Sequence, residues 1–209
     1  TNGLRDYSEI GTFRAGNDLA TINSAWNRWY KVIYDANVAL VKIPDCDFGS
    51  NNAMKEQFLG EAYFLRGWAY FELVRLFGNI PIIDSPMSPT EVKNIPQSTA
   101  RDVYDKIIIP DLTVAKSKLP VSSNMTDSKK SSIAKSGRAD QIAAQAMLAR
   151  VYMTMAGFPL NDNSALNLAE TELTAVITYF ESNGDKFWAP DRTESVPYTH
   201  LTLPTKRVA

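Results

Sequence analysis

The side chains that most often carry catalysis are scarce in this chain. His200 is the only histidine and Cys46 the only cysteine among its 209 residues. Ser-His-Asp and Cys-His arrangements need a histidine beside the nucleophile, and His200 stands alone near the C-terminal end. One histidine and one cysteine also cannot build a His-rich or Cys-rich metal site. We therefore expect no triad chemistry, no such metal centre and no catalytic residue.

Carboxylates are the remaining candidates for acid–base chemistry. A pair of Asp or Glu residues could hydrolyse a glycosidic bond, but only their separation in three dimensions decides this. Glu61 and Glu72 share a predicted helix with Arg66 and Arg75, which favours structural ion pairs. The Asp and Asn residues of segment 45–52 lack the EF-hand spacing, so a plain turn is the simpler interpretation.

No cofactor is expected, because the phosphate-binding patterns GxxxxGK[ST] and GxGxxG are absent from the sequence. Aromatic residues could instead stack on sugar rings. Trp26, Trp29 and Trp68 lie on helical stripes, which favours core packing. Trp188 lies outside a predicted helix and is a weak candidate for glycan binding, although a core anchor is the favoured interpretation.

The composition indicates a packed, globular chain. Hydrophobic residues make up 44% and aromatic residues 11%, which is ample for a core. The 22 basic and 23 acidic residues are interleaved and leave a net charge of -1, so no nucleic-acid partner is expected. No apolar run approaches the roughly 18 residues that a membrane-spanning helix requires.

Five stretches have helical periodicity, with polar, Pro-rich or Ser-rich connections between them. They cover approximately residues 22–43, 52–77, 99–119, 138–156 and 164–182. Helices of this length predict an all-α fold of antiparallel hairpins stacked in series, similar to an irregular tetratricopeptide solenoid. Residues 80–95 contain several prolines and predict an extended excursion with a short strand near Ile80–Ile83.

The second stretch is apolar around most of its circumference, so neighbours should cover it on more than one face. Gly60 and Gly67 are costly inside a helix, and close approach by another helix would compensate. Gly78 is placed to end this helix. Pro110 should kink or locally break the third helix.

The last residues differ from the rest. From about Ser195 the chain has neither helical period nor strand alternation, and its sequence resembles the translation of a sequencing adapter. We therefore treat residues 1–195 as one incomplete helical domain and 196–209 as a non-native tail.

The segment Gly60–Pro81 reads GEAYFLRGWAYFELVRLFGNIP. It resembles the GEAxFLR helix and following LVxx[FY]Gx[IV]P turn of the SusD/RagB family. The WxxWYxxIxxxN pattern at Trp26–Asn37, the Tyr104–Leu119 helix and Gly137-Arg138 before Ala143–Tyr152 agree in order. The resemblance covers nearly all of residues 1–195.

The resemblance implies a cell-surface lipoprotein for nutrient uptake in Bacteroidota, held in the outer membrane by an N-terminal lipid anchor. Such a protein binds glycans, in some members peptides, and delivers them to a SusC-type TonB-dependent transporter. It implies polysaccharide utilisation without enzymatic activity.

Two departures limit what the resemblance carries over. The lipid-bearing cysteine is absent from this sequence, because Cys46 follows the first predicted helix. Family members are also much longer, so we expect an N-terminal scaffold portion and transfer no glycan contacts to individual residues. A helical-repeat adaptor that binds only protein is the alternative, and an unrecognised glycosidase is a third.

Overall fold

Five predicted helices organise the computed structural model, which describes residues 2–14, 16, 19–125 and 137–183. Each lies within a few residues of its predicted bounds, so the all-α prediction is confirmed. The helical elements are α1 (Asn2–Gly11), α2 (Ala20–Lys42), η1 (Ile43–Asp45), α3 (Asn52–Phe77), α4 (Pro89–Val92), α5 (Ala100–Val103), η2 (Tyr104–Ile108), α6 (Ile109–Lys118), η3 (Ser122–Asn124), α7 (Gln141–Ala156) and α8 (Ala165–Asn183).

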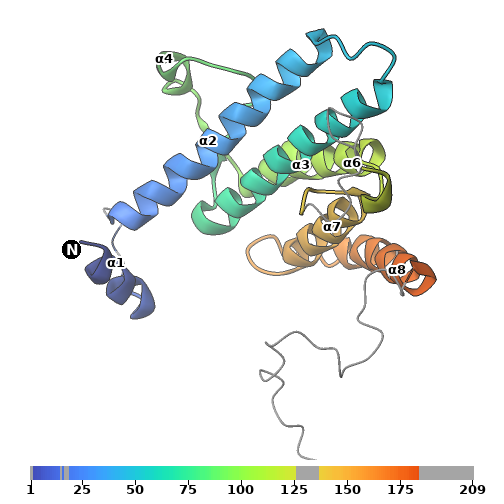
Figure 1. Ribbon diagram of the computed structural model, residues 1–209. Helices are drawn as coiled ribbons and strands as arrows, with labels where there is room; N and C mark the ends of the chain where they lie inside the picture. The colour runs from blue at the N-terminus through green and yellow to red at the C-terminus, as the bar shows by residue number, and fades with distance from the viewer. Residues whose placement is uncertain (1, 15, 17–18, 126–136, 184–209) are drawn as a thin grey trace, which may run out of the picture.

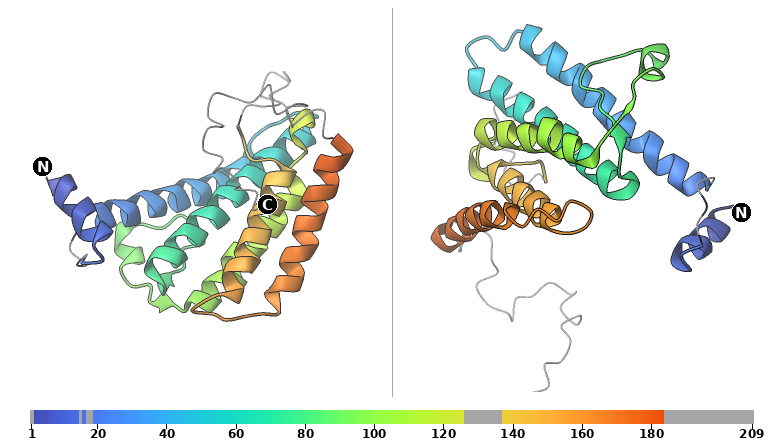
Figure 2. Two further views of the ribbon diagram at one scale, coloured as in Figure 1. Left: turned by 90° about the horizontal axis from the view of Figure 1, so that it is seen from below. Right: turned by 180° about the vertical axis from the view of Figure 1, so that it is seen from behind.

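The long helices pack one after another in chain order. α2 lies against α3, α3 against α6, α6 against α7, and α7 against α8 (Figure 1). The view from below shows the same series as a fan of neighbouring helices (Figure 2). Stacking of this kind lets each helix bury two faces, as in solenoids. The predicted series of hairpins is therefore present, with the excursion inserted between α3 and α5.

α3 is the central helix of this series. The Asn51 side chain caps its start by accepting from Met54 N at 3.1 Å, and Gly78, at φ +71°, ends it as predicted. Its residues Tyr70, Phe71 and Leu73 have no exposed surface. Neighbours on more than one side cover this helix, as its apolar circumference predicted.

The two glycines of α3 mark where the helix that follows in the stack comes closest. A Cβ on Gly60 would lie 2.9 Å from Leu119 Cγ and 3.1 Å from the Leu119 backbone nitrogen. A Cβ on Gly67 would lie 3.1 Å from Leu112 Cγ. The expected close approach is confirmed, and it brings α6 against α3.

The third predicted helix runs through a local irregularity at the residues before Pro110. There α5 passes into the π-helical turn η2, in which the Ile109 N–H donates to the Tyr104 carbonyl. Proline has no N–H and its ring displaces the carbonyl four residues earlier, so a wider turn accommodates it. The predicted local break at Pro110 is thus a π turn inside a continuous helix.

Two short strands close the excursion that follows α3. β1 (Ile80–Pro81) pairs antiparallel with β2 (Gln97–Ser98), and Ile80 lies opposite Ser98. The strand near Ile80 was predicted, whereas β2 was not. Between them, α4 begins with a capping box in which Ser88 N donates to Glu91 Oε2 at 2.7 Å. The excursion lies beside α2 (Figure 2, right).

The first helix is a small addition at the start of α2. The Asp6 carboxylate accepts from the Thr21 backbone N–H at 2.9 Å and from the Thr21 hydroxyl at 2.8 Å. Asp6 therefore caps α2 from a separate helix, because Leu19 at the N-cap position has no polar side chain. None of the helices in the described ranges is long and apolar enough to cross a bilayer.

Candidate functional site

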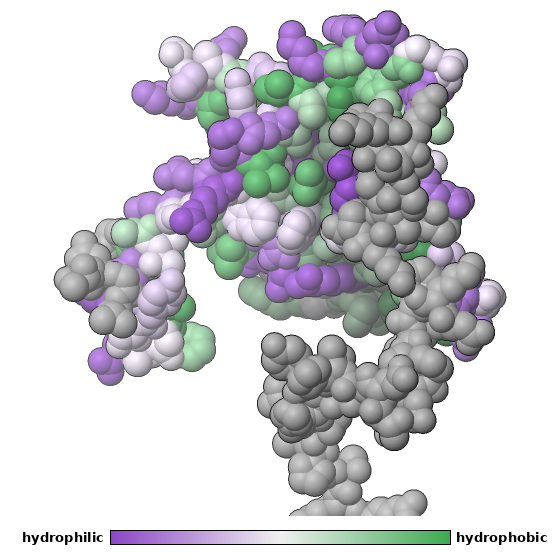
Figure 3. Space-filling view, in the orientation of Figure 1, coloured by the Kyte–Doolittle hydropathy of each residue, from purple (hydrophilic) through white to green (hydrophobic). Residues whose placement is uncertain are grey.

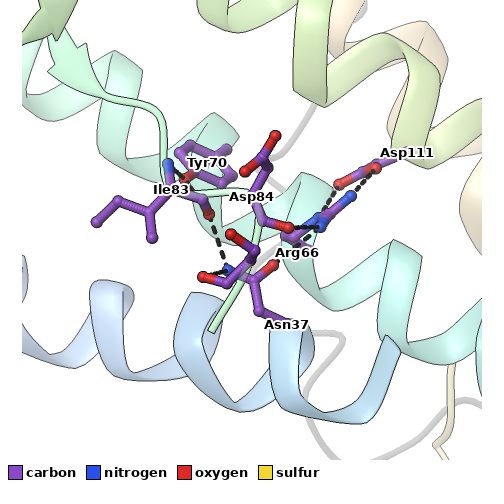
Figure 4. A network of polar contacts seen from close by, with 7 residues as sticks. Asn37, Arg66, Tyr70, Ile83, Asp84 and Asp111 are labelled. Carbon is purple, nitrogen blue, oxygen red and sulfur yellow. Dashed lines mark hydrogen bonds and ion pairs between the residues drawn. The ribbon is translucent and has the colours of Figure 1, made fainter. Parts of the chain in front are cut away.

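A buried ion pair joins three helices to the segment that follows β1. Arg66 Nε and Nη2 donate to the two carboxylate oxygens of Asp111 at 2.7 and 2.8 Å. Its Nη1 donates to Asn37 Oδ1 at 2.9 Å and to the Asp84 carbonyl at 3.1 Å. Figure 4 shows the guanidinium between these groups. One arginine on α3 therefore ties α2, α6 and the excursion together.

Both charged groups of this pair are shielded from water, with 11% of the Arg66 and 5% of the Asp111 side chain exposed. Burial raises the pKa of Asp111, although the Arg66 guanidinium works against this effect. Burial alone would lower the pKa of Arg66, but the hydrogen bonds and charge of Asp111 raise it. Such a pair determines which elements meet, because either partner alone would be an uncompensated buried charge.

A second set of hydrogen bonds attaches the backbone of residues 81–85 to α2 and α3. The Tyr70 hydroxyl donates to the Ile83 carbonyl at 2.9 Å and accepts from the Ile83 N–H at 2.6 Å. Asn37 Nδ2 donates to the same carbonyl at 2.8 Å, and the Tyr30 hydroxyl donates to the Pro81 carbonyl at 2.9 Å. Burial raises the pKa of both tyrosines, so each keeps the proton that it donates.

A cavity of about 800 Å³ lies between α2 and the excursion, and the attached segment forms part of its wall. This volume is in the range of small-molecule sites. The lining residues are mostly aromatic, aliphatic or proline, and none of those described carries a formal charge at neutral pH: Trp26, Asn27, Tyr30, Ile33, Tyr34, Pro81, Ile83, Pro86, Met87, Ser88, Pro89 and Val92.

The chemistry available in this cavity is that of binding. Its described lining offers aromatic rings, an amide and hydroxyl groups, but no carboxylate pair for proton transfer. Elsewhere in the described part of the chain, no cluster of three or more His, Cys, Asp or Glu residues is placed to hold a metal ion. The cavity can hold a neutral ligand by ring contacts and a few hydrogen bonds.

A smaller hollow of about 450 Å³ lies between α3 and the residues around the start of α7. Figure 3 shows green and pale residues near the middle of the visible face, with hydrophilic residues among them and around them. Arg138 Nε donates to Glu61 Oε1 at 2.9 Å across this hollow. The prediction that Glu61 pairs with an arginine of its own helix is therefore wrong, because Arg138, three residues before α7 begins, is the partner. Glu72 does pair locally, with Arg75 at 3.0 Å.

The structure places the other predicted residues as follows. Trp26, Trp29 and Trp68 are half-buried and pack against the core, as predicted, with Trp29 and Trp68 edge to face at 5.6 Å. Segment 45–52 is a turn in which Asp47 accepts from Gly49 N. Trp188, His200 and the predicted boundary at residue 195 lie outside the described residues.

Sequence reasoning did not single out Asp111 or Tyr70 as part of a site. Asn37 ends the WxxWYxxIxxxN pattern at Trp26–Asn37 without having been assigned a role, and it is 1% exposed. A polar side chain within an apolar stripe is the signal that could have found it, because buried polar groups need partners. The identity of those partners depends on segments 29 to 48 residues away.

A family model described as starch-binding and associating with the outer membrane, named SusD-like, matches residues 6–153. Among curated relatives, SusD-like protein P38 of Formosa agariphila is 32% identical over 167 residues. The alignment covers 78% of this chain and 28% of P38. The chain thus spans little more than a quarter of the length of this relative.

Solved structures are similar over most of the chain. A SusD superfamily protein from Parabacteroides distasonis superimposes with a TM-score of 0.71 at 28% identity, covering 83% of this chain and 35% of that protein. A protein solved with a xylogluco-oligosaccharide superimposes with a TM-score of 0.67 at 27% identity, covering 82% and 32%. Both support the mainly helical fold described above.

Proposed function

Since this chain belongs to the SusD-like family of starch-binding, outer-membrane-associated proteins, we propose that it serves glycan binding at the surface of a bacterial cell. The observation that carries the proposal is its similarity to the protein solved with a xylogluco-oligosaccharide. The neutral, ring-lined cavity beside α2 is consistent with a ligand that presents both hydroxyl groups and apolar ring faces.

The proposed role is capture without turnover. The description of the family model names starch binding, and one of the similar proteins was solved with a xylogluco-oligosaccharide. The cavity offers contacts that hold a ring and lacks, among its described residues, the paired carboxylates that glycoside hydrolysis uses.

The captured glycan passes, in this proposal, to a SusC-type TonB-dependent transporter in the outer membrane. The protein that contains this chain is held at that membrane by an N-terminal lipid anchor. Support comes from the outer-membrane association in the family description and from the sequence resemblance at Gly60–Pro81. The stacked helices α2 to α8 provide an extended scaffold for such a contact.

The test is a binding screen with the complete gene product, purified without lipid. Affinity electrophoresis in gels containing starch, xyloglucan or laminarin should show retardation by at least one glycan, and isothermal titration calorimetry with its oligosaccharides should give a saturable signal. Analysis of the glycans after incubation should show no shortening. Absence of binding to every glycan, together with no co-purification of a transporter, would overturn the proposal.

A further inference from the structure

We propose that the cavity between α2 and the excursion is a binding site for an uncharged sugar ring, and that it discriminates against anionic glycans. This inference rests on the proposed function and assigns a place and a ligand class to it. Three features of the cavity carry it: the spacing of its rings, its unused polar groups and its lack of charge.

The rings follow from helical geometry. Trp26, Tyr30 and Tyr34 are four residues apart on α2, so they lie on one face at intervals of about 6 Å along the axis. The Trp26 and Tyr30 rings meet at 4.8 Å with a 47° tilt, which makes an angled surface rather than a flat one. The apolar C–H face of a sugar ring can lie against such a surface, as aromatic side chains combine apolar bodies with polar edges.

The polar groups of the same face are available. Asn27 and Tyr34 are seven residues apart, two turns along α2, and both are exposed. Neither the Asn27 amide nor the Tyr34 hydroxyl makes a hydrogen bond to another residue in the described part of the chain. An amide and a hydroxyl each donate and accept, which suits neighbouring hydroxyl groups on a sugar.

The charge of the lining argues for an uncharged ligand. Lys31, the cation closest in sequence to the lining rings, pairs with Asp35 and lies 5.9 Å from the centre of the Tyr34 ring. A uronate or sulfate in the cavity would meet Pro86, Met87 and Val92 in place of water. Removing an anion from water without a paired cation is costly.

One wall of the cavity is already in place before a ligand arrives. Pro81 and Ile83 line it, and Tyr30, Tyr70 and Asn37 hold their backbone by the hydrogen bonds described above. A site that is already ordered binds its ligand more tightly, because no free energy is lost in ordering the protein on binding. The segment 81–85 therefore acts as a fixed support for the ligand.

The experiment uses calorimetry on the complete gene product with a neutral xylogluco-oligosaccharide and an anionic oligogalacturonate as probes. Tyr34→Ala and Asn27→Ala should each weaken binding of the neutral probe by about two- to tenfold. Matched controls are Asn52→Ala at the start of α3 and Tyr7→Ala on α1, both exposed and outside the cavity lining. These should leave the affinity unchanged.

The outcomes separate the two proposals. If the unaltered protein binds the neutral probe and both cavity variants bind it equally well, the site assignment is wrong while glycan binding stands. If the anionic probe binds more tightly and this binding is lost in Tyr34→Ala, the neutral class is wrong. A proline decapeptide that displaces the sugar, and binds without it only when Tyr34 is present, would make the cavity a peptide site. Failure of the protein to bind any glycan removes both proposals.

Discussion

Single atoms decide how closely α6 approaches α3. A Cβ on Gly60 would lie 2.9 Å from the Leu119 side chain and 3.1 Å from its backbone nitrogen, and the backbone cannot rotate away. The usual gain of about 1 kcal/mol for alanine over glycine in a helix is therefore outweighed by overpacking.

We expect Gly60→Ala to lower the free energy of unfolding by about 1–2 kcal/mol, measured by urea denaturation. Gly11→Ala is the matched control, because a Cβ there meets nothing within 4 Å. It should be neutral or stabilising. Equal stability of the Gly60 variant and the unaltered chain would contradict the close packing.

The Arg66–Asp111 pair gives a second prediction at this scale. Asp111→Ala leaves a buried guanidinium without its carboxylate and should cost about 3–5 kcal/mol in the free energy of unfolding. Replacing both residues, Arg66→Met with Asp111→Leu, should cost clearly less, because no buried charge remains. Asp105→Ala, which removes an exposed partner of Arg101, should cost less than about 1 kcal/mol. A double variant as unstable as the single one would contradict this account.

At the scale of elements, one tyrosine hydroxyl binds both backbone polar groups of Ile83 in the segment after β1. Tyr70→Phe leaves the Ile83 N–H without the acceptor it has at 2.6 Å, at a cost of about 1–3 kcal/mol. Asn37 still binds the Ile83 carbonyl, so the loss should be local.

Hydrogen exchange checks this prediction, because the Ile83 amide should exchange faster in the Tyr70→Phe variant while the amides of α7 do not. Tyr63→Phe on the same helix is the control, and it should leave the exchange of Ile83 unchanged. Unchanged protection of Ile83 in the Tyr70 variant would show that the segment is held by other means.

The attachment of α1 to α2 should depend on pH. Hydrogen bonds from the Thr21 N–H and hydroxyl lower the pKa of Asp6 below its ordinary value of 3.8. A carboxylate with a lowered pKa stabilises the folded form fully above its unfolded pKa, and this contribution is lost as the pH falls through its folded pKa. We expect the Thr21 amide resonance to shift, and α1 to detach, only below about pH 4.

The Asp6→Asn variant should abolish this pH dependence, because an asparagine does not titrate in that range. A Thr21 resonance that shifts equally in the variant and in the unaltered chain would assign the change to another carboxylate.

For the whole molecule, the last described helix of the stack, α8, leaves several apolar side chains exposed along one side. Leu166, Leu173 and Ile177 are 46%, 37% and 55% exposed, and their spacing of seven and four puts them on one stripe of α8. An apolar stripe at the end of a helical stack favours association.

We therefore expect the 209-residue chain to self-associate at high concentration in sedimentation velocity experiments. Leu166→Glu with Ile177→Lys should reduce the association without loss of helical circular dichroism. The control, Thr12→Glu with Arg14→Glu beyond α1, should leave it intact. Equal association of the stripe variant and the unaltered chain would exclude α8 as the contact.

The sequence predicted where the long helices lie. A helix that packs on any neighbour needs an apolar residue every three or four positions, and this spacing can be seen without knowing what the neighbour is. The helix end at Gly78 and the irregularity before Pro110 could be predicted as well. Glycine and proline act on the backbone close to their own positions. The family resemblance also depends only on residue order, and the match over residues 6–153 confirms it.

Tertiary structure alone decided which polar residues meet and where a ligand could lie. Glu61 pairs with Arg138 across 77 positions of the chain, and Arg66 with Asp111 across 45, instead of with their helical neighbours. The cavity has one wall from α2 and one from the excursion. It exists because Tyr30, Asn37 and Tyr70 hold the excursion beside α2. Periodicity describes one element at a time, whereas such contacts depend on the distance between elements.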